Sequence, residues 1–321
     1  MDATADYDFA SLLHQDLIVC TRAGSPNKLL INDGTGNFNN LEGAFGDPSS
    51  DDHPYTYSAT LLDANGDGHI DVFFVNQGQQ GSVLYFGTAQ GNFEIGVAEN
   101  EDLFGEGYLA GAYAVAADFN GDGLVDLYLA IHHTYTKNAL YLNEGIPASG
   151  SMRYRNVSFT KKEDLVQRPD GASRAAVAVD VDYDGDMDLF VVDYDSTCVL
   201  YINDGDAGFT FQSADGQAGV SEFTDTESTW VDVVAADFNG DGSMDLLVAA
   251  NDINPNALFL NAGDGTFLEV NQGDHGLPSG SSIPGYRLAA VDIDQDGDGK
   301  FPQSIFCSFE ALYVRRPFLF V

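Results

Sequence analysis

Short apolar segments alternate with turns along the chain. The segments KLLIN, SVLYF, NALYLN, CVLYIN and NALFLN are each followed by a turn rich in Gly, Asn or Asp. This arrangement is typical of strands, and few segments place apolar residues at helical spacing. Each unit reads as strand, acidic loop, strand, turn, strand, turn and strand, which predicts an all-β protein.

The acidic loops recur at a nearly constant period. Their first aspartates are separated by 55, 62, 57 and 55 residues and are Asp63, Asp118, Asp180, Asp237 and Asp292. A period of this length is expected of propeller blades. One period before Asp63, Asp6 and Asp8 precede the strand-like segment DLIV. We therefore expect a first unit whose loop is degenerate.

Radial packing of successive sheets explains such a repeat, because a single four-stranded sheet cannot bury both of its faces. We predict a β-propeller of four-stranded antiparallel blades over residues 1–300, with six repeats visible and the last incomplete. A linear β-solenoid or a sandwich array is the alternative, although the unit is long for one solenoid turn and short for a sandwich domain. Residues 301–321 break the pattern and are interpreted as a non-conforming, truncated or aberrant tail.

The loops match D-x-[DN]-x-D-G-x-x-D, which supplies oxygen ligands from positions 1, 3, 5 and 9 and a backbone carbonyl from position 7. The predicted ligands in four complete loops are Asp63, Asn65, Asp67, His69 and Asp71; Asp118, Asn120, Asp122, Leu124 and Asp126; Asp180, Asp182, Asp184, Asp186 and Asp188; and Asp237, Asn239, Asp241, Ser243 and Asp245. A flexible set of oxygen donors favours calcium, since magnesium prefers a small octahedral shell. The alternative is a set of acidic turns that merely face water.

A fifth loop departs from this pattern. It contains Asp292, Asp294, Asp296 and Asp298, but Lys300 stands where the last carboxylate belongs. We therefore expect about four well-formed calcium sites and a weak or empty fifth. An EF-hand would need flanking helices and a Glu at position 12. Position 12 is apolar in the four complete loops, so the loops are expected within β-hairpins.

Composition and charge narrow the possible partners. The 321 residues are 44% hydrophobic, which is enough for a large core, and 50 acidic against 13 basic residues give a net charge of -37. Such a surface repels nucleic acid and anionic membranes. Three cysteines are too few for a disulfide framework. The sequence shows neither a signal peptide nor a transmembrane segment, so we expect no direct membrane insertion.

The segments DFNGDGLVDLYLA, DFNGDGSMDLLVAA and NALFLNAGDGTF resemble the FG-GAP and VCBS repeat family, which contains the integrin α-subunit propeller and cartilage acidic protein. The resemblance covers nearly all of residues 1–300. It implies a propeller, usually seven-bladed, with calcium in the hairpin loops. It also implies an extracellular role in adhesion, ligand binding or glycan binding.

Three functional hypotheses follow. The first is a protein-binding or cell-adhesion module whose loops make the contacts. The second is a lectin in which Tyr108, Tyr135 and Trp230 stack on sugars, although such aromatics also serve as core residues. The third is a polysaccharide-active enzyme, a lyase or hydrolase, with His132 and His133 or paired carboxylates as acid and base. The other interpretation of the two histidines is loop surface. No common catalytic motif is present, so we predict a non-enzymatic protein with a protein or glycan ligand.

The expected calcium affinity bears on location. Loops in extracellular modules bind calcium at about 10⁻⁴ to 10⁻³ M, far more weakly than cytosolic sites. The sequence Asn156-Val157-Ser158 is also a glycosylation sequon, although such triplets often arise by chance. We therefore expect an extracellular or cell-surface protein.

Overall fold

The computed structural model describes residues 15–21, 25–45, 55–78, 81–96, 109–132, 137–146, 157–162, 173–193, 198–212, 230–250, 256–270, 288–290 and 305–307. These residues form strands and turns, without a helix among them. The all-β prediction is confirmed. The described part of the chain accordingly contains no helix that could span a membrane.

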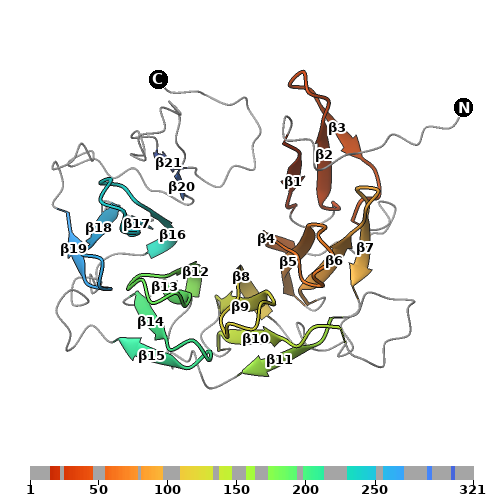
Figure 1. Cartoon of the computed structure of the whole chain (residues 1–321). Helices are drawn as coiled ribbons and strands as arrows, with labels where there is room; N and C mark the ends of the chain where they lie inside the picture. The colour runs from red at the N-terminus through yellow and green to blue at the C-terminus, as the bar shows by residue number, and fades with distance from the viewer. Residues whose placement is uncertain are drawn as a thin grey trace, which may run out of the picture. The chain divides into compact units, whose positions relative to one another are not determined.

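The strands form the four-stranded antiparallel sheets that define propeller blades (Figure 1). One blade consists of β4 (Tyr55–Leu62), β5 (Asp71–Gly78), β6 (Val83–Gly87) and β7 (Phe93–Gly96). The next consists of β8 (Leu109–Ala117), β9 (Asp126–Ile131), β10 (Ala139–Asn143) and β11 (Phe159–Lys162). The two are joined where β5 pairs with β8, at Gln77 with Ala110 and Gly78 with Leu109. The predicted order of strands within a unit is thus observed.

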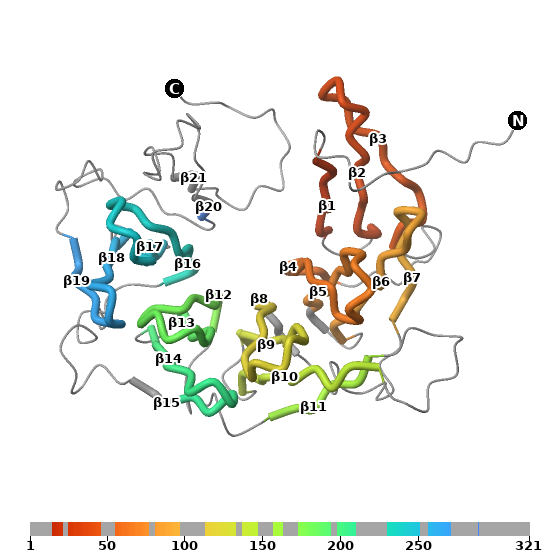
Figure 2. The backbone as a smooth tube through the Cα atoms, in the orientation of Figure 1, coloured from red at the N-terminus to blue at the C-terminus, as the bar shows by residue number. Residues whose placement is uncertain are grey.

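Two further blades follow the same order. They are β12 (Ser173–Val179), β13 (Asp188–Asp193), β14 (Val199–Asn203) and β15 (Phe209–Gln212), then β16 (Trp230–Ala236), β17 (Asp245–Ala250), β18 (Ala257–Asn261) and β19 (Phe267–Glu269). Figure 2 follows the backbone through the reversals between their strands. The chain divides into two compact units, residues 1–173 with 203–210 and residues 174–202 with 211–321.

The ends of the chain contribute smaller sheets. β1 (Leu17–Val19), β2 (Lys28–Asn32) and β3 (Phe38–Leu41) form a three-stranded sheet. β20 (Leu288–Ala290) pairs with β21 (Ile305–Cys307). β21 lies within residues 301–321, the segment that departs from the repeat pattern.

The second strand of a blade is buried on both faces. All six residues of β9, β13 and β17 are buried, which explains why these segments read as continuous apolar runs rather than alternating ones. Phe73, Leu127 and Tyr141 belong to one core cluster of the first unit. Phe190 and Phe259 belong to a core cluster of the second. Within each compact unit, neighbouring blades therefore bury their faces against each other.

An asparagine at the end of the third strand connects each of three blades to the acidic loop of the preceding blade. The side-chain amides of Asn143, Asn203 and Asn261 donate hydrogen bonds of 2.8 Å to the backbone carbonyls of Ala64, Phe119 and Val181, respectively. Each acceptor is position 2 of its loop. The loops are thus fixed at one end by the following blade.

Candidate metal-binding loops

Each complete loop joins the first strand of a blade to the second. Residues 63–71 connect β4 to β5 and residues 118–126 connect β8 to β9. Residues 180–188 connect β12 to β13, and residues 237–245 connect β16 to β17. The loops therefore lie in hairpins, as the sequence predicts. The first residue of each loop directly follows one strand and the last residue begins the next, so the sheet sets the width of each loop.

The aspartate at position 9 is buried and accepts a hydrogen bond from the start of its own loop. Asp71, Asp126, Asp188 and Asp245 are fully buried, and each accepts a hydrogen bond of 2.8–2.9 Å from the backbone N–H of position 2 in its own loop. The other carboxylate oxygen of Asp126 accepts the backbone N–H of Asn143 at 2.7 Å. Asp71 and Asp245 accept corresponding bonds from Gly87 and Asn261. Position 9 thus also fixes the third strand. Each oxygen keeps a second lone pair for an ion.

Burial changes the acidity of these groups. Removal from water raises the pKa of Asp71 and of Asp126 to about 6, against an ordinary value of 3.8. The backbone hydrogen bonds oppose this shift, and the carboxylates at positions 5 and 1 reinforce it. The pKa of Asp245 is raised for the same reasons. A cation beside these groups would favour their charged form.

One of the two position-9 hydrogen bonds is also present in the first repeat, where the loop motif is degenerate. Asp16 directly precedes β1, and its carboxylate accepts the backbone N–H of Asn32, the last residue of β2, at 2.7 Å. Asp16 and Asp71 are 55 residues apart, so the period of the loops could have identified Asp16. The sequence analysis pointed instead to Asp6 and Asp8, which lie outside the described residues.

Positions 1, 3 and 5 turn their oxygens inward. In the second complete loop, Asp118 accepts the backbone N–H of Asp122 at 3.2 Å and that of Gly123 at 2.8 Å. Asn120 accepts the N–H of Asp122 at 3.1 Å, and Asp122 accepts that of Leu124 at 2.8 Å. The loops at residues 63–71 and 237–245 repeat these bonds. Side-chain oxygens from positions 1, 3 and 5 thus line a curled backbone.

The glycine at position 6 allows the curl. Gly123 has a φ of 85°, a conformation that residues with a Cβ rarely adopt. A Cβ built on Gly123 would meet no heavy atom within 4 Å. The requirement for glycine is therefore conformational rather than steric.

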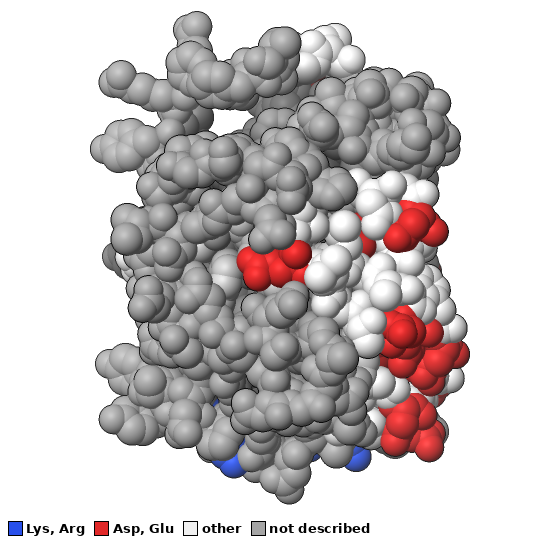
Figure 3. Space-filling view, turned by 90° about the vertical axis from the view of Figure 1, so that its left-hand side faces the viewer, with Lys and Arg blue, Asp and Glu red and all other residues white. Residues whose placement is uncertain are grey.

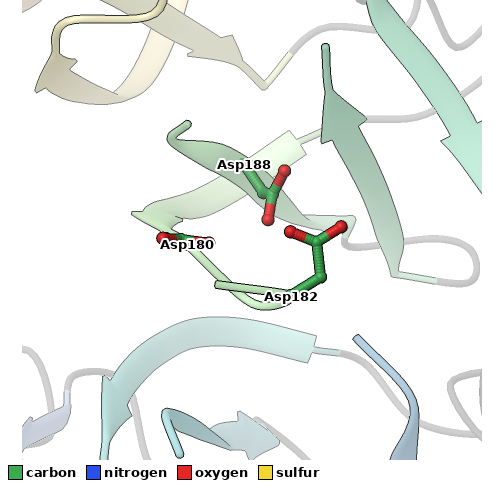
Figure 4. Close-up of side chains that lie close together, drawn as sticks. All are labelled: Asp180, Asp182 and Asp188. Atoms are coloured by element: carbon green, nitrogen blue, oxygen red, sulfur yellow. The ribbon is translucent and has the colours of Figure 1, made fainter. Parts of the chain in front are cut away.

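The loop at residues 180–188 has the strongest concentration of carboxylates. One oxygen from each of Asp180, Asp182 and Asp188 lies within 4.8 Å of the others. The carboxylates of Asp182 and Asp188 face one another across the loop (Figure 4). Oδ1 of Asp180 and Oδ1 of Asp182 are buried and have no hydrogen-bond partner among the described residues. Burial and the charge of Asp184 raise the pKa of Asp182.

This arrangement fits a hard divalent cation. Buried carboxylate oxygens without a donor are costly, and a cation at the common point of the three groups would compensate them. The donors are all oxygen, as calcium requires. Asp184 and Asp186 lie in the same loop, and the backbone N–H of Asp186 donates to Asp184 at 2.9 Å. The residues present therefore suit calcium.

Acidic side chains form separate groups on the described surface in Figure 3. The fifth loop, with Asp292, Asp294, Asp296 and Asp298, lies outside the described residues, so its site stays a prediction.

The burial of Trp230 contradicts the prediction that this residue stacks on sugars. It was considered as an exposed, sugar-stacking aromatic, but its side chain is 4% exposed and belongs to the core of the second unit. The alternative interpretation, a core residue, is the correct one for Trp230. Tyr108, Tyr135 and His133 lie outside the described residues. His132 directly follows β9 and is half-buried.

Comparison with known proteins identifies the repeats. The FG-GAP-like repeat model matches residues 63–129, 118–191, 180–248 and 237–299, which together span more than half of the chain. No curated protein sequence is significantly similar to the chain.

Several solved structures align with the chain. An Agrocybe aegerita lectin that recognises non-reducing terminal N-acetylglucosamine aligns with a TM-score of 0.52 and 17% identity, over 79% of this chain and 64% of the lectin. The V. cholerae biofilm matrix protein Bap1 aligns at 0.44 and 17%, over 81% of this chain and 36% of Bap1. A putative exo-beta-1,3-galactanase from Bifidobacterium bifidum aligns at 0.38 and 14%, over 74% of this chain and 72% of that protein.

At 17% identity, the lectin match shows a shared fold. The repeat match, the strand order of the blades and the recurring hairpin loops all lead to one conclusion. The chain belongs to the FG-GAP repeat family of β-propeller proteins.

Proposed function

We propose that the chain is a calcium-binding β-propeller that acts outside the cell as a protein-binding or adhesion module. In this proposal the four complete loops hold calcium. The ions stiffen the hairpins, and the surface formed by the loops contacts a protein ligand. The role is binding rather than catalysis.

The observation that carries the calcium proposal is the loop at residues 180–188. Three carboxylates converge there, and two of their buried oxygens lack a donor among the described residues. Mutual repulsion of close carboxylates is strong in a partly buried setting. A bound divalent cation turns this repulsion into attraction. The proposal extends to the other three loops because they share positions 1, 5 and 9.

An extracellular role follows from the expected affinity. Oxygen-ligand loops in extracellular modules bind calcium at about 10⁻⁴ to 10⁻³ M. Such sites fill at the millimolar calcium outside cells. The net charge of -37 also favours cations over anionic partners.

Equilibrium dialysis of the purified chain against calcium tests the metal sites directly. We expect bound calcium, and a melting temperature higher in calcium than in excess chelator, because ligand binding stabilises the folded state by about 1.4 kcal/mol per site at tenfold excess over Kd. Asp182→Ala should reduce both effects, because it removes the side-chain oxygen that every complete loop has at position 3. Glu94→Gln removes an exposed charge outside the loops and is the matched control. Equal melting curves in calcium and chelator, with no bound metal, would refute the proposal.

The adhesion role needs a second experiment. The immobilised chain is incubated with extracellular extract in calcium and in chelator, and captured proteins are compared with those on the Asp182→Ala variant. We expect a protein that is retained only in calcium and less on the variant. Retention that is identical in all three conditions would contradict a calcium-dependent binding surface.

A carbohydrate ligand is the second candidate, supported by the fold shared with a lectin. The burial of Trp230 removes one of the three aromatics considered for sugar stacking. A glycan array probed with the calcium-loaded chain distinguishes the two candidates. Saturable binding to one glycan class would favour the lectin, and an empty array would favour a protein ligand.

A further inference from the structure

Tyr183 sets the loop at residues 180–188 apart from the other complete loops. It occupies position 4, where the other three loops have Gly66, Gly121 and Gly240. Its φ is 62°, a left-handed conformation that is unusual for a residue with a bulky side chain. A tyrosine in this conformation is disfavoured unless its side chain makes compensating contacts.

The compensating contacts lie in the loop of the following blade. The phenol hydroxyl of Tyr183 donates to the backbone carbonyl of Gly242 at 2.8 Å and accepts the backbone N–H of Met244 at 2.8 Å. Gly242 and Met244 are positions 6 and 8 of the loop at residues 237–245. They flank Ser243, whose carbonyl is the predicted ligand from position 7. The phenol therefore holds the peptide groups on both sides of a proposed calcium ligand.

Two other contacts make this connection firm. The backbone carbonyl of Val181 accepts the side-chain amide of Asn261 at 2.8 Å and the backbone N–H of Gly265 at 3.0 Å. Position 2 of the loop at residues 180–188 is thus attached to the blade that carries the loop at residues 237–245. Position 4 is attached to the loop at residues 237–245 itself. The glycines at position 4 of the other loops have no side chain and cannot make the second attachment.

We propose that Tyr183 couples the two loops, so that calcium bound in the loop at residues 180–188 raises the calcium affinity of the loop at residues 237–245, and the reverse. This inference rests on the proposed calcium binding. An ion held by Asp182 and Asp184 fixes Tyr183 between them. The fixed phenol orders Gly242 and Met244 in advance, which reduces the entropy that the second loop loses on binding.

Repulsion between the two ions acts in the opposite direction, but it does not depend on the phenol. A double-mutant cycle therefore separates the two effects. Tyr183→Phe removes only the hydroxyl and keeps the ring. Tyr183→Gly also removes the ring and installs the residue found in the other loops, which relieves the unusual φ. Asp241→Ala removes the position-5 carboxylate and weakens the second loop.

The calcium affinity of each loop can be followed in the full chain by NMR with ¹⁵N-glycine labelling. The N–H of Gly185 donates to Asp180 and that of Gly240 donates to Asp237, so each amide signal reports its own loop. With Tyr183 present, Asp241→Ala should weaken calcium binding at the Gly185 loop about fivefold, the lower end of typical coupling between sites. In the Tyr183→Phe and Tyr183→Gly backgrounds the same change should alter it less than about twofold.

The possible outcomes separate the inference from the proposed function. An equal effect of Asp241→Ala with and without the phenol overturns the coupling, while calcium binding itself stands. Loss of coupling in Tyr183→Gly but not in Tyr183→Phe overturns the role of the hydroxyl. If neither glycine signal shifts with calcium in the unmodified chain, calcium binding by these loops is refuted.

Discussion

The side-chain amide of Asn143 donates a hydrogen bond of 2.8 Å to the backbone carbonyl of Ala64, 79 residues earlier in the chain. The same amide donates to the carbonyl of Val125 at 3.0 Å, and its oxygen accepts the N–H of Gly145 at 2.9 Å. The backbone N–H of Asn143 donates to Asp126. One buried residue thus connects the loop of its own blade to the loop of the preceding blade.

Replacing this residue should weaken the contact between blades. We expect Asn143→Ala to lower the free energy of unfolding by about 1–3 kcal/mol, because buried polar groups lose their partner. Urea denaturation in chelator measures the change. Asn40→Ala, at an exposed position of β3, is the control and should stay within about 0.5 kcal/mol of the unmodified protein. Equal effects of the two substitutions would show that the asparagine link adds no stability.

Positions 9 and 5 of a loop should respond differently to the loss of their charge. Asp126→Asn should lower the free energy of unfolding by about 1–3 kcal/mol in both calcium and chelator, because an amide cannot accept both the Phe119 and the Asn143 N–H groups. Asp122→Asn should destabilise mainly in calcium, since Asp122 is exposed. Paired denaturation curves check this. A purely calcium-dependent effect of Asp126→Asn would contradict the structural role of position 9.

The conformation of Gly123 gives a third prediction. Gly123→Ala should cost about 1–2 kcal/mol, the penalty for placing a Cβ in the left-handed region. Gly123→Asn should cost less, since asparagine adopts this region more readily. The two variants are compared by denaturation in chelator. A larger loss for the asparagine variant would point to steric crowding, which the open space around Gly123 argues against.

The metal-free protein should become less stable as the pH rises from 5 to 7. The folded-state pKa of Asp71 and of Asp126 is about 6, above the ordinary 3.8. The folded state therefore holds protons that the unfolded state has released, and its stability falls as those protons leave. Thermal melts at several pH values in chelator measure this slope. Asp126→Asn should flatten it, and an unchanged slope in that variant would exclude Asp126 as a source.

The hairpin loops could be predicted from the sequence because their determinants are local. Asp63, Gly68 and Asp71 lie within nine residues, and the apolar runs on either side are strands in every described blade. The motif also predicts that position 9 is a ligand. Its two backbone hydrogen bonds were not predicted, because one donor lies on a strand 16 or 17 residues further on.

The contacts between blades could not be predicted from the sequence, because they join residues that are far apart along the chain. Asn143 and Ala64 meet because two neighbouring blades of one compact unit pack side by side, and Tyr183 reaches Gly242 for the same reason. The burial of Trp230 could not be predicted from its residue type. Aromatic residues occur both in cores and on surfaces, and the packing of β16 places Trp230 in the core.

Asp16 carries a wider consequence. It holds the end of β2 in a unit whose loop has lost the acidic pattern between Asp8 and Asp16. Anchoring of the hairpin and capture of an ion are thus separable tasks that share one carboxylate where both are present. With the calcium binding that we propose, a repeat can lose its ion through substitutions at positions 3 and 5 and still keep its fold, so the number of bound ions and the number of blades can vary independently.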